Sequence, residues 1–305
     1  MTARGSEIDW TEIVIAVVGG DEREQEIARL AAETGAVVRA YGFPWPPRGI
    51  DGVTRAADAI DAVSGARYVL FPIPGMGPDN SLFAPDSPEP IIPDDAMLGK
   101  LASGAHIILG TASEQLRSIA SQAGVAVDEY ESDQELMLLR TPAVIEGAIR
   151  LAVENTDVTI HRARVAVVGY GSIASNLART LIGLGAQVHV AARNPVQRAA
   201  AYAVGALPVP LDELRALAPK LDMLFSAVPA RVVDRDVLEQ LPRGSLVMDL
   251  AAPPGSVDLD AAEELGHRAV WARGQGRRAP VTVGASQWMG IKRRIEAMEG
   301  DRRES

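Results

Sequence analysis

The sequence contains no cysteine, which excludes disulfides, thiol catalysis and metal sites with cysteine ligands. Histidine is also scarce, and no two of the four histidines stand at the spacing of a metal site. They are His106, His161, His189 and His267. We therefore expect no metal centre in this protein.

Basic residues are in the minority, since 30 Lys and Arg face 40 Asp and Glu and give a formal net charge of −10. This balance argues against nucleic acid as a partner, although it leaves room for a small basic pocket that binds an anion. No apolar run reaches the roughly 18 residues of a membrane-spanning helix, and no N-terminal stretch has the layout of a signal peptide. We expect a soluble cytoplasmic protein with no membrane partner.

Hydrophobic residues make up 47% of the 305 residues, which is enough for the cores of two ordinary domains. Short apolar runs alternate with helical patterns, as in parallel sheets that are covered on both faces. The predicted strands are Ile13–Val18, Val37–Tyr41, Tyr68–Pro72, His106–Leu109, Arg164–Val168, Gln187–Ala191, Met223–Val228, Ser245–Leu250 and Ala269–Ala272. The expected fold class is α/β, with two Rossmann-like, doubly wound parallel-sheet domains and a cleft between them.

The two halves of the chain match each other at one constant offset, the offset that separates Ile15 from Val165. Residues 15–19 (IAVVG) align with residues 165–169 (VAVVG), and the pairs Ala28-Arg29 and Gly35-Ala36 recur at the same offset. Each copy has the order strand, tight turn, helix, glycine and second strand. This correspondence indicates an architectural duplication, although unrelated β-α-β units also resemble one another.

The domain boundary is expected near residue 140, because Thr141-Pro142 is typical of a helix start. We predict a first domain over 1–140 and a second over 141–283. A helix at about 284–298 would pack back on the first domain, and 299–305 would form a mobile, charged tail. Proline and glycine crowd residues 72–93, which suggests a long irregular loop.

The most specific motif is the dinucleotide fingerprint that follows the strand ending at Val168. Gly169 would permit the tight turn, and Gly171 would let the backbone approach a pyrophosphate. Ala174 replaces the third glycine, a variant that still allows close helix packing. The amides of Ser172, Ile173 and Ala174 would then face the phosphates at a helix N-terminus.

The end of the following strand predicts which cofactor binds. An acidic residue there would accept bonds from the ribose of NAD, but this chain has Arg193 and Asn194, with Arg198 one turn later. Arginine pairs with a 2′-phosphate, so NADP is predicted. Arg198 could equally lie on a solvated helix face. The loops at Ala227-Val228-Pro229 and at Asp249 to Ala251 are further expected cofactor contacts, because ligands bind at the carboxyl ends of parallel strands.

The first copy lacks the fingerprint, because Asp21 and Glu22 stand where the second copy has Gly171 and Ser172. Acidic groups at that helix start would repel a pyrophosphate, so this domain is expected to bind something else. Asp21 and Arg23 could line the cleft and contact substrate, or Asp21 could only cap the helix.

Beyond the general Rossmann pattern, the chain resembles the A-subunit family of dipicolinate synthase of spore-forming bacteria over nearly its whole length. The distinctive stretches are 141–147 (TPAVIEG) with 155–161 (NTDVTIH), the opening 19–23, Asp249-Leu250-Ala251 with Pro254-Gly255, and 279–284. Some positions depart from the family, including Glu24 where a glutamine is common, Pro253 where an arginine is common, and the basic loop 274–278.

The resemblance implies NADP-dependent oxidation of a dihydrodipicolinate-level intermediate of the lysine (diaminopimelate) pathway to dipicolinate during sporulation. It also implies a flavoprotein-like B subunit as partner, and a homo- or hetero-oligomer is expected. The substrate would be a small dicarboxylate, for which Arg23, Arg277 and Arg278 are the basic candidates. Ser113, Thr141 and Asn80 could donate neutral hydrogen bonds, although each also suits a helix cap or a turn.

Catalysis would need a base that takes a proton from the ring, and Asp21 and Glu146 are the candidates. The candidate catalytic residues are thus Asp21, Arg23, Thr141 and Glu146, although Glu146 also suits a structural helix position. Two alternatives stay open: another NAD(P)-dependent dehydrogenase of a small carboxylic acid, and a non-catalytic NADP-binding regulatory subunit.

Overall fold

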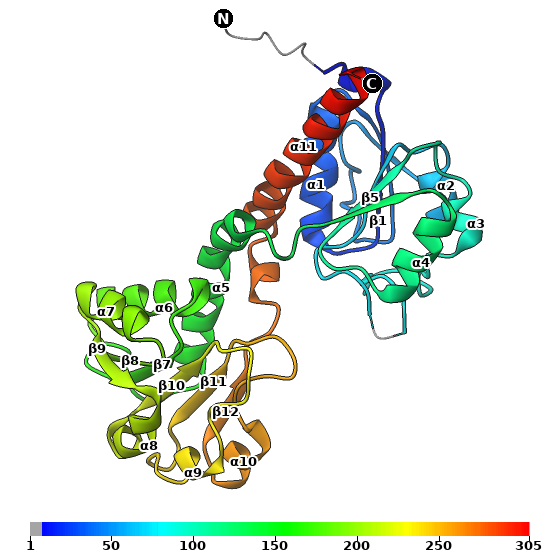
Figure 1. Cartoon of the computed structure of the whole chain (residues 1–305). Helices are drawn as coiled ribbons and strands as arrows, with labels where there is room; N and C mark the ends of the chain where they lie inside the picture. The colour runs from blue at the N-terminus through cyan, green and yellow to red at the C-terminus, as the bar shows by residue number, and fades with distance from the viewer. Residues whose placement is uncertain (1–7, 78, 305) are drawn as a thin grey trace, which may run out of the picture. The chain divides into compact units, whose positions relative to one another are not determined.

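The computed structural model describes residues 8–77 and 79–304 (Figure 1). The chain divides into two compact units: unit 1 is the chain up to Leu139 together with the chain from Ala279, and unit 2 is Arg140–Arg278. Each unit contains one six-stranded sheet in which every neighbouring pair of strands is parallel. The predicted α/β class with two Rossmann-like sheets is confirmed.

In unit 1 the strand order is β3-β2-β1-β4-β5-β6. The strands are β1 (Val14–Val18), β2 (Val37–Tyr41), β3 (Val53–Arg55), β4 (Tyr68–Leu70), β5 (His106–Leu109) and β6 (Ala126–Glu129). The helices are η1 (Trp10–Glu12), α1 (Glu22–Glu33), α2 (Ala59–Val63), α3 (Asp95–Leu98), α4 (Glu114–Gln122) and α11 (Pro280–Glu304). Helix α11 comes from the far end of the chain and packs along α1 (Figure 1).

Unit 2 repeats this topology in the order β9-β8-β7-β10-β11-β12. Its strands are β7 (Arg164–Val168), β8 (Gln187–Ala192), β9 (Leu207–Pro210), β10 (Met223–Ser226), β11 (Leu246–Asp249) and β12 (Arg268–Trp271). Its helices are α6 (Ser172–Gly183), α7 (Pro195–Ala203), η2 (Leu211–Glu213), α8 (Leu214–Leu217), η3 (Ala218–Lys220), α9 (Arg235–Leu238), α10 (Leu259–Glu264) and η4 (Gln275–Arg278). Helix α5 (Gln134–Glu154) contains the division between the units.

The constant offset between the two halves of the sequence is visible in the elements themselves. Strand β7 begins and ends at the positions that correspond to the ends of β1, and α6 corresponds to α1 in the same way. In both sheets the first strand pairs with strands on either side, β1 with β2 and β4, and β7 with β8 and β10. The strand order therefore reverses beside β1 and beside β7, which is where ligands bind in doubly wound sheets.

Burial on both faces explains why the central strands are apolar without alternation. Val165 and Val167 of β7 pack into one core cluster of unit 2, whereas Ala166 and Val168 pack into the other. A strand with both faces covered has no solvent-facing positions for polar residues.

Three strands, β3, β6 and β9, were not predicted from the sequence, and each is the last strand on one edge of a sheet. Their residues are mostly exposed or half-buried. An edge strand needs little apolar surface, and these three produce no apolar run that sequence reading could find, whereas the edge strand β12 does contain one and was predicted.

Helix α5 begins at Gln134, before the expected start at Pro142, and contains this proline. Asp133 starts the helix instead, because its Oδ1 accepts the amide hydrogens of Glu135 and Leu136. The Leu136 side chain also packs against Gly290 of α11, which stabilises the first turns. Pro142 has no amide hydrogen and removes one helical hydrogen bond without ending the helix.

The tail expected over 299–305 is also different from the prediction, since α11 continues through Glu304, and Ser305 lies outside the described residues. Glu299 is buried, and it accepts hydrogen bonds from the Tyr68 hydroxyl at 2.6 Å and from Arg67 Nη1 at 3.1 Å. The charged residues that suggested a solvated tail thus include one buried side chain, Glu299, which is hydrogen-bonded to Tyr68 of β4.

Candidate functional site

The turn after β7 in unit 2 requires a glycine. Gly169 has φ +91°, and a Cβ atom built on it would come within 2.8 Å of Val228 Cγ2. Its amide donates a hydrogen bond to the Ala191 carbonyl at 2.8 Å, which ties the turn to β8. Only a residue without a side chain fits this conformation and this space.

The N-terminus of α6 is open to an anion. Gly171 is its N-cap residue, no side chain of the described residues caps it, and a Cβ built on Gly171 would meet nothing within 4 Å. The amides of Ser172, Ile173 and Ala174 form the first turn, where helical amides have no partner within the helix. Ala174 is buried and allows the close packing expected of the third fingerprint position. The chain therefore provides space, amide donors and the positive end of a helix dipole, which fit a pyrophosphate.

Three residues at the end of β8 were expected to contact the ribose of the cofactor, and their contacts within the protein differ. Arg193 is exposed, whereas Asn194 caps α7 by accepting the Val196 amide at 2.8 Å. Arg198 Nη1 donates to the Ala192 carbonyl at 2.8 Å and to the Arg193 carbonyl at 2.7 Å. One nitrogen of Arg198 thus holds the strand end in place.

The loop after β11 is organised by Asp249, which is fully buried. Its carboxylate accepts the amides of Ala251, Ser256 and Val257 at 2.6–3.0 Å, and also the Ser256 hydroxyl at 2.8 Å. Four donors satisfy its acceptor sites, so the structure gives Asp249 a loop-forming role beside the cofactor role expected from the sequence. Ala251 is likewise engaged, since its carbonyl accepts Trp271 Nε1 at 3.0 Å.

The loop after β10 presents mostly its backbone. Ala227 donates its amide to Val168 at 3.3 Å, and Val228 lies against the Gly169 turn. Pro229 follows and has no amide hydrogen. Ser226, the last residue of β10, is fully buried, and its hydroxyl has no hydrogen-bond partner among the described residues. Sequence reading had no signal for this serine.

In unit 1 the residues that begin α1 form a buried charged cluster. Asp21 caps the helix by accepting the Arg23 amide at 3.1 Å, and the Arg23 guanidinium donates from Nε and Nη2 to its two carboxylate oxygens. Burial lowers the pKa of Arg23, but the hydrogen bond to Asp21 and the charges of Glu24 and Asp21 outweigh it and raise the pKa above its ordinary value. Asp21 and Arg23, both proposed to contact substrate, are thus already paired with each other.

Glu24 belongs to the same cluster and was not among the expected site residues. It is 1% exposed, and burial raises its pKa to about 7, while the charge of Arg23 and two backbone hydrogen bonds act in the opposite direction. A capping box, in which the third helical residue reaches back to the N-cap amide, is the sequence signal that could have found it.

The remaining catalytic candidates lie on α5. Thr141 is buried inside this helix, not at its start. The side chain of Glu146 is 67% exposed and forms an ion pair with Arg278. Among the neutral candidates, Ser113 caps α4 by accepting the Leu116 amide at 3.1 Å, and Asn80 has φ +61°, as turn residues often do.

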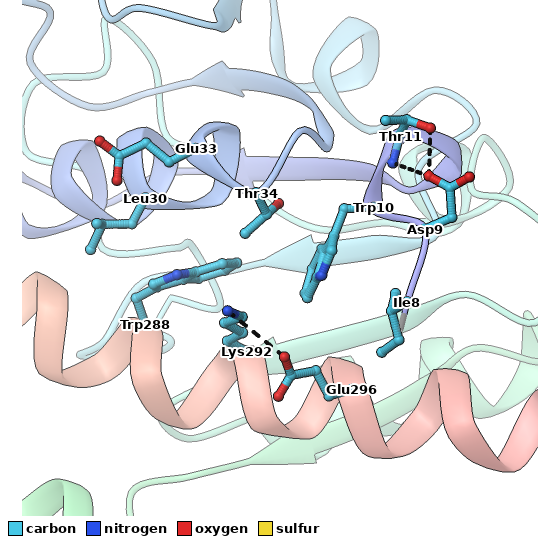
Figure 2. Close-up of a pocket in the computed structure, with 10 residues that line it drawn as sticks. All are labelled: Ile8, Asp9, Trp10, Thr11, Leu30, Glu33, Thr34, Trp288, Lys292 and Glu296. Atoms are coloured by element: carbon cyan, nitrogen blue, oxygen red, sulfur yellow. Dashed lines mark hydrogen bonds and ion pairs between the residues drawn. The ribbon is translucent and has the colours of Figure 1, made fainter. Parts of the chain in front are cut away.

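Unit 1 also has a cavity of about 750 Å³ at the other end of α1 (Figure 2). It is lined by Ile8, Asp9, Trp10, Thr11, Leu30, Glu33, Thr34, Trp288, Lys292 and Glu296. The rings of Trp10 and Trp288 lie 6.3 Å apart between centroids, and Lys292 Nζ lies 5.9 Å from the Trp10 ring. The acidic groups are engaged, since Glu296 lies 3.8 Å from Lys292, Glu33 pairs with Arg29, and Asp9 accepts bonds from Thr11. No sequence pattern indicated this cavity.

Two negative observations apply to the part of the chain that the structure describes. No group of three or more His, Cys, Asp or Glu side chains is arranged to hold a metal ion. No helix in this part has the length and hydrophobicity needed to span a membrane.

Comparison with known proteins identifies the family. The chain is 30% identical over 296 residues to the dipicolinate synthase A subunit of Bacillus subtilis (strain 168), covering 95% of this chain and 99% of that protein. The chain belongs to the dipicolinate synthase A-subunit family. The matching family profile, the N-terminal domain of the dipicolinate synthase A subunit, covers residues 14–130.

Solved structures of this family have the same architecture. The crystal structure of the dipicolinate synthase A chain from Bacillus subtilis matches with a TM-score of 0.85 at 27% identity, over 97% of this chain and 99% of that chain. The A-subunit structure from Bacillus halodurans matches with the same TM-score of 0.85 and 27% identity, over 93% and 98% of the two chains.

Residues 150–267 in addition match the profile of the shikimate / quinate 5-dehydrogenase family. This stretch contains β7, α6 and β8, the elements that form the open turn of the fingerprint. The chain is therefore a subunit of dehydrogenase type, with a Rossmann fold suited to a nicotinamide cofactor.

Proposed function

We propose that this protein is the A subunit of a dipicolinate synthase and binds NADP at the open end of α6. The single observation that carries the proposal is the uncapped N-terminus of α6 behind the Gly169 turn, in a chain of this family. The amides of Ser172, Ile173 and Ala174 would hold the pyrophosphate, and the small side chain of Ala174 would keep the helix close to the sheet.

The choice of NADP over NAD rests on two arginines. Arg193 is exposed at the end of β8, and Arg198 has one nitrogen bound to two carbonyls at that same end. These two bonds hold the Arg198 guanidinium at the end of β8, and they support the proposal that it contacts the cofactor ribose. A 2′-phosphate would pair with these two cations, whereas the hydroxyl of NAD would leave both without a counter-charge.

The proposed substrate is a dihydrodipicolinate-level ring of the lysine pathway with two carboxylates. Its oxidation removes a hydride, which the nicotinamide accepts, and a proton from the ring, and it yields the aromatic dicarboxylate. The protein would bind and orient the ring. Arg23 in unit 1, or Arg277 and Arg278 with Thr141 in unit 2, are the candidates for this binding, and Asp21 or Glu146 is the candidate base.

The proposed partner is a flavoprotein-like B subunit, and the proposed setting is the cytoplasm of a sporulating cell. The name of the Bacillus subtilis relative supports a multi-subunit enzyme, because that protein is itself named as one of the subunits of a synthase.

A second candidate function is an NADP-binding subunit that does not itself catalyse the oxidation. One observation favours it: both carboxylates proposed as the base are paired with arginines, Asp21 with Arg23 and Glu146 with Arg278. Each of these carboxylates thus already has an arginine partner within the protein.

One experiment separates the two functions. The protein is mixed with NADP and freshly generated pathway intermediate, with and without a candidate B subunit, and dipicolinate is followed by its ultraviolet absorbance. Dipicolinate formation coupled to NADPH supports the synthase. NADP binding without turnover in both mixtures supports the non-catalytic role, and absence of NADP binding at millimolar concentration contradicts both.

A further inference from the structure

The two units can be compared position by position, because their first strands and first helices correspond at one constant offset. Asp21 and Glu24 of unit 1 correspond to Gly171 and Ala174 of unit 2. Ile15 corresponds to Val165. Ile15 pairs with Tyr68 of β4 and Val165 pairs with Met223 of β10, so Tyr68 corresponds to Met223. Ile73 and Val228 follow these two residues at the same distance along the chain, and they therefore also correspond.

In unit 1 a carboxylate lies between two backbone amides of this crevice. Glu24 Oε2 accepts the Asp21 amide at 2.8 Å, and Glu24 Oε1 accepts the Ile73 amide at 2.8 Å. The first amide belongs to the start of α1 and the second to the loop after β4. The carboxylate thus bridges the two elements that flank the reversal of strand order, where an open Rossmann unit binds its ligand.

A glycine makes room for this carboxylate. Gly20 has φ +105°, and a Cβ atom built on it would come within 2.4 Å of the Glu24 side chain. Gly20 also donates its amide to the Phe83 carbonyl at 2.7 Å, so the loop after β4 covers the crevice. The carboxylate is consequently buried and not part of a solvated surface.

In unit 2 the corresponding amides have no such acceptor. Ala174 carries no polar group, and neither the Gly171 amide nor the Val228 amide has a hydrogen-bond partner within residues 8–77 and 79–304. The same backbone arrangement is therefore closed by a side chain in one unit and open in the other.

We propose that the Glu24 carboxyl group occupies the phosphate position of the first Rossmann crevice and closes this crevice to nucleotides. Its carboxylate makes with two amides the contacts that a phosphate oxygen would make, and it holds the loop after β4 against the start of α1. Each chain then has one dinucleotide site, in unit 2, although it has two Rossmann crevices. The acidic residue Glu22 in the first turn of α1 acts in the same direction, since its charge repels phosphate from this helix start.

The test is to remove the carboxylate and supply a small anion in its place. Glu24→Ala leaves a space that fits formate, with two amides that lack an acceptor. We expect sodium formate at pH 8 to raise the melting temperature of this variant by about 5 °C relative to sodium chloride of equal ionic strength, as binding to the folded state requires.

The matched controls are the wild-type protein and Glu24→Gln, which both keep the space filled and should show equal melting temperatures in formate and chloride. If Glu24→Ala is unfolded in chloride, formate should restore its folded circular dichroism spectrum. Equal behaviour of Glu24→Ala in the two salts, folded or unfolded, would overturn the proposal.

The reciprocal variant tests the same idea in unit 2. Ala174→Glu places a carboxylate at the corresponding position, and we expect it to weaken NADP binding at least 10-fold, whereas Thr180→Glu, at an exposed position further along α6, should bind nearly as wild type. A folded Ala174→Glu variant with unchanged NADP affinity would contradict the equivalence of the two crevices. The formate experiment needs no nucleotide, so failure of the NADP proposal would not affect its outcome.

Discussion

The Arg23 guanidinium donates one hydrogen bond to each carboxylate oxygen of Asp21, both at 2.8 Å, and both side chains are buried. A buried charge pair of this kind depends on both members, because removal of one leaves the other uncompensated away from water. From the sequence these two residues are candidates for substrate contact, and the structure adds that each is the counter-charge of the other.

The first prediction concerns this pair. Arg23→Ala should lower the free energy of unfolding by about 3–5 kcal/mol, since it leaves the Asp21 carboxylate buried without its cation. The measurement is urea denaturation at pH 7. Arg29→Ala is the control, because this arginine pairs with Glu26 and Glu33 with its side chain 41% exposed and should cost less than about 1 kcal/mol. Similar losses in both variants would show that the buried pair has no special role.

The second prediction is a pH dependence from Glu24. Burial raises its pKa from the ordinary 4.5 to about 7, so the folded protein binds this proton more tightly than the unfolded chain. The stability from this proton is fully present below pH 4.5 and is lost as pH rises through 7. The difference between these two pKa values corresponds to about 3 kcal/mol of unfolding free energy.

Glu24→Gln cannot ionise and should lack this dependence. The difference in unfolding free energy between the variant and the wild type should therefore shift in favour of the variant by up to about 3 kcal/mol between pH 4.5 and pH 8. Glu114→Gln, at an exposed position in the first turn of α4, should run parallel to the wild type. A constant difference between Glu24→Gln and the wild type across this range would refute the assignment.

The third prediction tests cofactor choice. Arg193→Ala should raise the Kd for NADP by about 10- to 100-fold, as expected for loss of a charge-assisted bond to phosphate, and leave the Kd for NAD within about twofold. Both constants can be measured by calorimetry. Arg179→Ala, which removes an exposed arginine of α6, serves as control. An equal loss for NAD and NADP would eliminate the proposed role of Arg193.

The fourth prediction separates the two roles of Asp249. Asp249→Asn replaces an acceptor of four hydrogen bonds with a group that is partly a donor, and should cost about 2–4 kcal/mol of stability. Asp260→Asn, at an exposed position of α10, should cost almost nothing. A variant that keeps its stability but loses NADP affinity would instead show that Asp249 acts as a direct cofactor ligand.

The fifth prediction concerns the end of α11. Glu299→Ala should lower the free energy of unfolding by about 2–4 kcal/mol, because the Tyr68 hydroxyl and Arg67 lose a shared acceptor. Glu296→Ala, one turn earlier and 3.8 Å from Lys292, is the matched control and should change stability by less than about 1 kcal/mol. Thermal denaturation that cannot distinguish the two variants would mean that the end of the helix contributes nothing.

The sequence determined the central part of each unit. The strands β1, β7 and β10 are apolar on both faces, and the turn at Gly169 needs a residue without a side chain, so both features follow from residue type and order. The internal repeat is visible in the sequence for the same reason: the two copies use equivalent residues at equivalent turns. Edge strands such as β3 and β9 escaped notice because an exposed edge places few demands on its residues.

Tertiary structure alone decided which polar residues are already engaged. Whether Asp249, Arg198 or Glu299 faces a ligand or the protein depends on amides, carbonyls and hydroxyls that lie elsewhere along the chain, and the spacing of residues does not encode these distances. The start of α5 was decided in the same way, because the packing of Leu136 on α11 outweighs the local preference of Pro142 to begin a helix. Residue type and order determine where a turn or a buried strand can form, whereas the partners of a side chain are fixed only when distant segments come together.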